Sequence, residues 1–262
     1  MTNLLAEKIQ FDARDLEQRI KEMYTDVAQN PNGDYHFEMG RTMAERLGYS
    51  PAILQRVPAA AIDSFAGVGY HFDLAAIETG DHIVDLGSGS GMDSFYASIL
   101  TGGNGKVSGI DMTPAQLVKA STLGTQNGFT NIDFNAGYIE HTGIADASVD
   151  VVISNGVINL VPDKHAVFKE AARLLKPGGR LAISDIVTEK RLPENITCDA
   201  ALWAACIGGA LSIRDYLDAI AAAGLELFYV QTNTGYRFLS DGAQWATQTY
   251  GVKSISLVAH KK

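Results

Sequence analysis

A glycine-rich segment and two aspartates are the residues whose types and spacing best suit ligand binding. Residues 83–91 read IVDLGSGSG, an apolar run that leads through Asp85 into glycines at every second position. A dinucleotide-binding loop would place its third glycine at position 92, where this chain has Met92. Asp111 ends the next apolar run, where its carboxylate can accept hydrogen bonds from both hydroxyls of a ribose. The spacing therefore favours a nucleoside ligand without a pyrophosphate.

From residue 82 onward, strands and helices are predicted to alternate, and they must position this loop. Short β-branched runs lie between segments with helical spacing, which is typical of βαβ units on a parallel sheet. The predicted strands are 82–86, 106–111, 132–135, 149–154, 180–186, 226–231 and 254–259. The predicted helices are 93–100, 114–127, 163–175, 212–223 and 242–250. We expect a doubly wound, Rossmann-like α/β fold with seven strands and the glycine loop at the carboxyl edge of the sheet.

The flanking segments are predicted to be helical. Residues 1–80 are predicted to form an N-terminal helical lid that begins with a helix over residues 6–28, and residues 81–262 to form the ligand-binding domain. An apolar helix over 192–211 interrupts the alternation of that domain and is a candidate wall for the binding cleft.

Composition and charge disfavour several classes of protein. The chain is 46% hydrophobic and 19% charged, which is typical of a globular protein. Its 21 Lys and Arg against 30 Asp and Glu give a net charge of −9, which disfavours a nucleic-acid partner or an anionic membrane. The longest apolar run, 200–211, is too short for the roughly 20 residues of a membrane span. An N-terminus without a signal peptide and only two cysteines predict a cytoplasmic location.

Three segments resemble class I S-adenosylmethionine-dependent methyltransferases. They are DLGSGSG at 85–91, GIDMT at 109–113 and VISNGVINLVPDK at 152–164. Within that superfamily, residues 49–211 are similar to the arsenite methyltransferase family. The resemblance implies S-adenosylmethionine as cofactor, a small-molecule methyl acceptor and an antiparallel final strand.

The resemblance also implies a role for individual residues. Those that would line the methionine moiety are Asp85, Gly87, Ser88, Gly89 and Gly91. Those that would contact the nucleoside are Asp111 at the ribose and Met112, Ile139 and Glu140 at the adenine. Asn155 would lie beside the reacting methyl group, and Tyr24 would close over the cofactor.

The acceptor side departs from the family pattern. Arsenite enzymes hold trivalent arsenic with cysteine thiolates, which are soft ligands. Two of the family's cysteine positions are Val68 and Gly156 in this chain, and only Cys206 matches a family cysteine. Cys198 would add a second thiol only if the helix bends, because eight helical residues span about 12 Å. The resemblance thus implies either a small organic acceptor or thiol, or arsenite held by Cys206 and Cys198.

His71 and Tyr70 follow the missing cysteine position and are candidates for contact with the acceptor. His71 would serve as general base, because an imidazole with a pKa of about 6.5 suits proton transfer near neutrality. The alternatives are a polar histidine of the helical segment and, for Cys206, a cysteine that only packs in an Ala-rich helix. The third hypothesis is a noncatalytic protein that binds S-adenosylmethionine. The intact cofactor loops argue against it.

Overall fold

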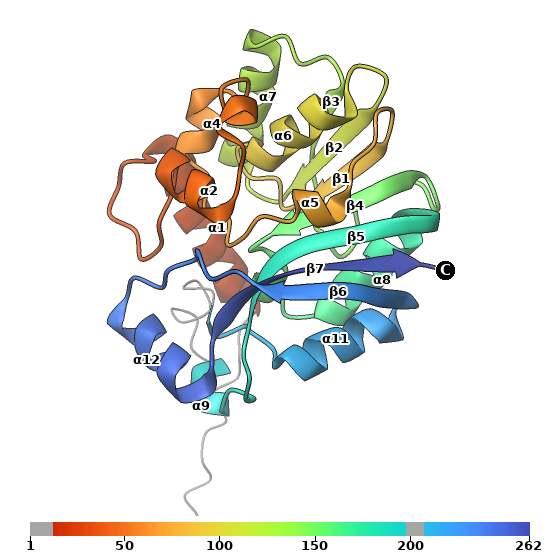
Figure 1. The fold of residues 1–262 in the computed structure, drawn as a ribbon. Helices are drawn as coiled ribbons and strands as arrows, with labels where there is room; N and C mark the ends of the chain where they lie inside the picture. Colours follow the sequence, from red (N-terminus) through yellow and green to blue (C-terminus); the bar gives the residue numbers. More distant parts are fainter. Residues whose placement is uncertain (1–12, 198–206) are drawn as a thin grey trace, which may run out of the picture.

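The computed structural model describes residues 13–197 and 207–262, and they form a seven-stranded sheet with helices on both faces (Figure 1). The strand order is β3-β2-β1-β4-β5-β7-β6. The strands are β1 His82–Leu86, β2 Lys106–Asp111, β3 Ile132–Ala136, β4 Val149–Asn155, β5 Leu175–Val187, β6 Leu225–Thr232 and β7 Lys253–Lys261. β1 to β5 pair in parallel, whereas β7 runs antiparallel to both β5 and β6. The predicted fold class and the antiparallel final strand are confirmed.

The five helices predicted after residue 92 are confirmed to within a residue at each end, as α6, α7, α8, α11 and α12. Those before the sheet are α1 Ala13–Gln29, α2 Arg41–Leu47, α3 Pro51–Leu54, α4 Ala59–Asp63 and α5 Phe72–Ala75. Those that follow are α6 Met92–Thr101, α7 Pro114–Gln126, the 3-10 helix η1 Ile158–Leu160, α8 Lys164–Leu174, α9 Glu194–Thr197, α11 Ile213–Ala222 and α12 Asp241–Tyr250. Side-chain caps fix three of the starts, because Asp163 accepts a hydrogen bond from the amide of Ala166, Ser212 from that of Asp215 and Ser240 from that of Ala243.

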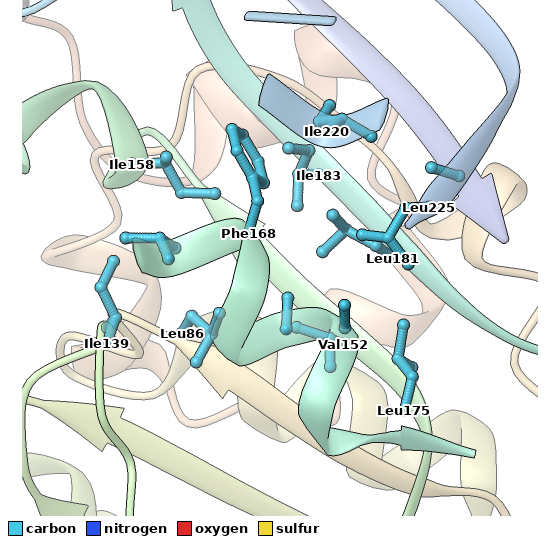
Figure 2. Packing of buried hydrophobic residues seen from close by; sticks show 14 of the residues in the cluster. Leu86, Ile139, Val152, Ile158, Phe168, Leu175, Leu181, Ile183, Ile220 and Leu225 are labelled. Atoms are coloured by element: carbon cyan, nitrogen blue, oxygen red, sulfur yellow. The ribbon is translucent and has the colours of Figure 1, made fainter. Parts of the chain in front are cut away.

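The core lies on both faces of the sheet because successive strand residues point in opposite directions. On β4, Val152 joins the cluster under α8 and α11, whereas Val151 and Ile153 join the cluster under α2 to α6. Figure 2 shows the first cluster, in which Phe168 of α8 packs among residues of the strands and of α11. Its ring meets that of Tyr216 edge-on, with centroids 5.1 Å apart. This packing fixes the central strands, whose ends carry the loops of the site.

Two predictions differ from the structure or extend beyond it. β5 begins at Leu175, directly after α8, and not at position 180 as predicted. The lysine, proline and glycines at 176–179 therefore lie within the strand, where its pairing with β4 is irregular. The predicted apolar helix over 192–211 is described only at its ends, since α9 covers Glu194–Thr197 and residues 198–206, with Cys198 and Cys206, lie outside the described residues. No helix in the described part of the chain is long and apolar enough to cross a bilayer.

Candidate active site

A cavity of about 380 Å³ opens at the carboxyl ends of the central parallel strands. Its walls are the loops that follow β1, β2, β3 and β4, and on the opposite side α1 and residues 64–67. This is the edge at which open α/β sheets bind ligands, and the volume lies in the range of small-molecule sites. The sequence-predicted residues that line it are Tyr24, Asp85, Gly87, Ser88, Gly89, Asp111, Met112, Ile139, Glu140 and Asn155.

The glycine loop has a backbone that other residues would distort. Gly87 has φ +79°, and a Cβ atom at this position would lie 2.5 Å from both methyl groups of Val157. Ser88 also lines the cavity, and its buried hydroxyl has no hydrogen-bond partner among the described residues. Gly91 does not line the cavity; it begins α6 with φ +90°, and its Cβ would meet the ring of Phe134 at 2.7 Å. The prediction that Gly91 contacts a ligand is therefore replaced by a role in starting the helix.

Asp111 joins the end of β2 to the glycine loop. Its Oδ2 accepts a hydrogen bond from the amide of Gly89 at 2.9 Å, and its Oδ1 accepts one from the amide of Thr113 at 2.8 Å. Burial raises the pKa of Asp111, and these backbone donors oppose the rise. The residue lines the cavity, and a carboxylate is a group that can accept hydrogen bonds from a vicinal diol.

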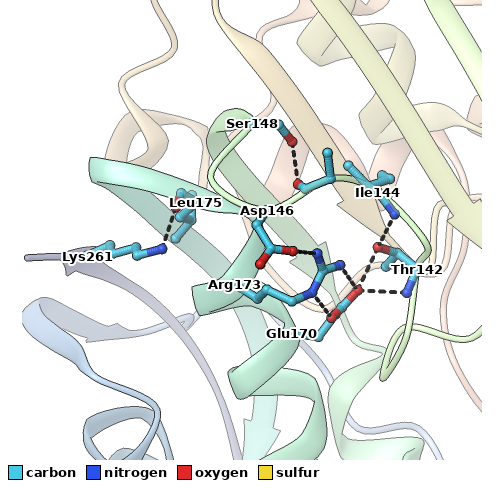
Figure 3. A network of polar contacts seen from close by, with 9 residues as sticks. Thr142, Ile144, Asp146, Ser148, Glu170, Arg173, Leu175 and Lys261 are labelled. Atoms are coloured by element: carbon cyan, nitrogen blue, oxygen red, sulfur yellow. Dashed lines mark hydrogen bonds and ion pairs between the residues drawn. The ribbon is translucent and has the colours of Figure 1, made fainter.

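A polar network anchors the loop that carries Ile139 and Glu140. Both the amide and the hydroxyl of Thr142 donate to Oε1 of Glu170 at 2.7 Å, and Arg173 bonds both Glu170 and Asp146 (Figure 3). Burial works against the charge of Glu170, but the hydrogen bonds from Arg173 and Thr142 outweigh it and lower the pKa to about 2. The loop after β3 is thereby tied to α8.

Two buried carboxylates, Asp85 and Asp93, line the cavity, and Asp93 was missed from the sequence. Asp93, in the first turn of α6, accepts hydrogen bonds from the hydroxyl of Tyr49 at 2.7 Å and from Nδ2 of Asn155 at 3.0 Å. Asp85 accepts one from the hydroxyl of Ser94 at 2.6 Å. An aspartate in the otherwise apolar stretch after the glycine loop is a signal that could have indicated Asp93.

Asn155 connects this carboxylate pair to residues 67–69. Its Oδ1 accepts a hydrogen bond from the amide of Val68 at 2.8 Å, and its Nδ2 donates to the carbonyl of Gly69 at 3.0 Å. A Cβ on Gly67 would lie 2.7 Å from that Nδ2. The side chain at the end of β4 is therefore held from both sides, at the position where the resemblance implies methyl transfer.

His71 and Tyr70 do not reach the cavity. His71 is fully buried, its Nδ1 lies 3.3 Å from the hydroxyl of Ser184, and its Nε2 has no partner among the described residues. Tyr70 lies half-buried against Tyr49, with its hydroxyl 3.2 Å from a carboxylate oxygen of Asp73. The interpretation of His71 as a general base is not supported by this geometry, because the imidazole faces β5 and does not line the cavity.

Burial gives His71 a different effect, on stability. It lowers the pKa of His71 from 6.5 to about 3, so between these values the unfolded chain binds a proton that the folded chain does not. Stability should fall as the pH falls, by about 2 kcal/mol from this residue at pH 5. Urea unfolding at about pH 8 and pH 5 should show a smaller loss for His71→Asn than for wild type, with exposed His165→Asn as control. Equal losses in all three proteins would contradict the effect.

Helix α1 is held over the cavity through its backbone. Nε2 of Gln116 donates to the carbonyl of Tyr24 at 2.9 Å, and the hydroxyl of Ser64 donates to that of Val27 at 2.9 Å. Nζ of Lys119 donates to the carbonyl of Ala28 at 2.8 Å. These contacts place Leu16, Ile20 and Tyr24 of α1 in the cavity wall, as was predicted for Tyr24.

The chain matches known methyltransferases in sequence and in structure. Residues 77–240, more than half of the chain, match the family model described as a methyltransferase domain. The arsenite methyltransferase of Halobacterium salinarum is 39% identical over 199 residues, which are 76% of this chain and 51% of that protein. The human arsenite methyltransferase is 49% identical over 138 residues, 49% of this chain and 37% of that protein. The chain thus spans about half or less of the length of these relatives.

Solved structures agree with this assignment. The crystal structure of an arsenic(III) S-adenosylmethionine methyltransferase from Chlamydomonas reinhardtii superposes with a TM-score of 0.62 at 29% identity, covering 86% of this chain and 75% of that one. A geranyl diphosphate C-methyltransferase from Streptomyces coelicolor A3(2) shares the fold, with a TM-score of 0.69 at 18% identity, covering 96% of this chain and all of that one. The resemblance inferred from the three sequence segments is confirmed, and the chain belongs to the methyltransferase domain family.

Proposed function

We propose that this protein transfers a methyl group from S-adenosylmethionine to a small organic acceptor. The residues present fit that cofactor: the backbone of the glycine loop lines the cavity at Gly87 and Gly89, and the carboxylate of Asp111 lines it at the end of β2. When bound, S-adenosylmethionine supplies a methyl group activated by a sulfonium. Asp111 would hold the ribose hydroxyls, while Met112 and Ile139 would pack against the base.

The chain's own contribution is alignment and exclusion of water. The acceptor's lone pair must attack the methyl carbon opposite the breaking carbon–sulfur bond, and closure by α1 would keep both partners in line and dry. The cavity presents carboxylates and no Lys, Arg or His among its described lining residues. An acceptor with a lone pair available near neutrality, such as a thiolate or a neutral amine, suits this site best.

The observation that carries the choice of acceptor is the contact between Val68 and Gly156. A Cβ atom on Gly156 would lie 3.1 Å from Cγ1 of Val68, so the two positions at which the resemblance implies thiols are neighbours. Here they form an apolar contact, and Val68 packs in a buried cluster with Leu160 and Ile186. The loss of soft thiolate ligands at both neighbouring positions favours an organic acceptor over a metalloid.

The test is release of S-adenosylhomocysteine by purified protein under reducing conditions. Arsenite and a panel of small thiols, phenols and amines would be run side by side. We expect turnover with an organic acceptor and little with arsenite. Strong turnover with arsenite alone would overturn the choice of acceptor but keep the methyltransferase assignment.

Arsenite methylation is the second candidate, because the relatives with 39% to 49% identity carry that name. It would use Cys206 and Cys198, which lie outside the described residues. Ile207, the residue after Cys206, belongs to the same buried cluster as Val68.

Cys206→Ser separates the two candidates. Turnover of an organic acceptor should stay within about twofold of wild type, because serine preserves the size of the side chain and no thiolate is needed. Arsenite turnover should fall by at least about a hundredfold if it depends on thiolate ligands. The measurement is the initial rate with each acceptor, and Cys198→Ser should show the same pattern, since it removes the other thiol of the arsenite candidate. A large loss with the organic acceptor would contradict our proposal.

A further inference from the structure

The loop between β4 and α8 forms one wall of the cavity. Its lining residues are Gly156, Val157, Leu160, Val161 and Pro162. Asn159 lies in the middle of this loop, within η1, but it is fully buried and is not one of the residues that line the cavity. The contacts of Asn159 behind the wall therefore decide how firmly the wall is held.

Asn159 is bound to Asp185, a buried carboxylate near the end of β5. Nδ2 of Asn159 donates a hydrogen bond to Oδ1 of Asp185 at 2.7 Å. The hydroxyl of Tyr216, on α11, donates to Oδ2 of Asp185 at 2.7 Å, and the amide of Ile186 donates to Oδ1 at 2.8 Å. Asp185 is 1% exposed. This carboxylate thus joins the cavity wall to the sheet and to α11.

Lys164 holds the wall at a second position. Its buried Nζ donates to the carbonyl of Val161 at 2.8 Å. Burial raises the pKa of Asp185, and the hydrogen bond from Tyr216 and the charge of Lys164 are among the effects that oppose the rise. Because buried charged groups are costly without their partners, these contacts favour a single arrangement of the wall.

The wall contacts the two segments that the proposed function uses. A Cβ atom on Gly87 would lie 2.5 Å from both methyl groups of Val157, so Val157 packs directly against the glycine loop. Leu160 belongs to the same buried cluster as Val68, one of the replaced thiol positions. A displacement of the wall would therefore change the shape of the glycine loop and of the surface beside Val68.

We propose that Asn159 and Asp185 are positioning residues, which hold the loop after β4 in the arrangement that binds S-adenosylmethionine without lining the cavity themselves. The inference rests on the proposed function and extends it to two buried side chains behind the site. Their hydrogen bond orders the loop before a ligand arrives, so binding does not have to supply the free energy of ordering it.

The test is titration calorimetry of the whole protein with S-adenosylmethionine and with S-adenosylhomocysteine, at a temperature at which circular dichroism shows every variant to be folded. Asn159→Ala removes the donor on the wall. Kd for both ligands should rise about tenfold, the loss expected if the loop then adopts the binding arrangement for about a tenth of the time.

Asp185→Asn tests the other side of the same contact and preserves the volume of the side chain. It should raise Kd to a similar extent, because an amide nitrogen or a single oxygen cannot serve all three donors. The double variant of Asn159→Ala with Asp185→Asn should bind about as tightly as the weaker single variant, since both changes break one contact.

Leu225→Ala is the control for loss of stability alone. Leu225 is buried in the same hydrophobic cluster as Tyr216, but it lies at the start of β6, at the edge of the sheet opposite the cavity. Its truncation should lower the midpoint of urea unfolding and leave Kd within about twofold of wild type.

Four results would overturn the inference. Folded Asn159→Ala and Asp185→Asn that bind as tightly as wild type refute the positioning role and leave the proposed function standing. Losses that multiply in the double variant refute action through one contact. An equal loss of affinity in Leu225→Ala attributes the effect to general destabilisation. If wild type binds neither ligand, the proposed cofactor fails and the inference fails with it.

Discussion

Replacing Asp111 by alanine is expected to weaken the binding of S-adenosylmethionine by about 1.5 to 3 kcal/mol, or about 10- to 150-fold in Kd. The carboxylate at the end of β2 lines the cavity, where it can accept hydrogen bonds from a ribose, and it also accepts those of Gly89 and Thr113. Its removal therefore costs charge-assisted hydrogen bonds to the ligand and loosens the glycine loop. Titration calorimetry measures the change directly.

The control for Asp111→Ala separates ligand contacts from general loss of structure. Asp218→Ala removes an exposed carboxylate of α11 and should leave Kd unchanged. Asp111→Asn keeps the shape of the side chain and one oxygen acceptor, so its Kd should lie between those of wild type and the alanine variant. An unchanged Kd for Asp111→Ala would refute the assignment of the ribose to this residue.

Gly87→Ala is expected to lower the free energy of unfolding by about 2 to 4 kcal/mol and to weaken cofactor binding at least about tenfold. Two effects add: an alanine at φ +79° is strained, and its Cβ would lie 2.5 Å from the methyl groups of Val157. The loop must shift toward the space in which a ligand would lie. Guanidinium unfolding and calorimetry report the two consequences.

Gly128→Ala is a matched control for the backbone strain. Gly128 has φ +72°, and a Cβ there would meet nothing within 4 Å, so only about 1 to 2 kcal/mol should be lost. The double variant Gly87→Ala with Val157→Ala should recover part of the loss, since it removes the methyl groups that collide. If Gly87→Ala and Gly128→Ala lose the same stability, close approach to Val157 is not the cause.

Local patterns were enough to predict the sheet and the cofactor side of the cavity. β1 and β2 have their predicted bounds, because each carries β-branched residues and is followed by a loop. Asp85, Ser88 and Asp111 line one cavity because the chain delivers them from the ends of neighbouring strands. The position of a residue along a predicted strand indicates the edge of the sheet at which it lies, and that position can be predicted from the sequence alone.

Contacts between distant segments could not be predicted in the same way. Tyr49 reaches Asp93 across 44 positions of sequence, and no periodicity indicates that the two meet. His71 follows the missing cysteine position at Val68 in the sequence, yet its ring points toward Ser184 and the sheet. The acceptor side is made of such contacts, which explains why its chemistry was harder to predict than that of the cofactor side.

The attachment of α1 has a consequence for how this enzyme can diversify. Tyr24, Val27 and Ala28 are held through main-chain carbonyls, which every amino acid supplies. Substitutions along α1 can thus change the surface offered to the acceptor without detaching the helix, provided that Ser64, Gln116 and Lys119 remain. Descendants of such a protein can acquire new substrates through a few replacements at positions such as Leu16 and Ile20, while the half of the cavity that receives the cofactor stays constant.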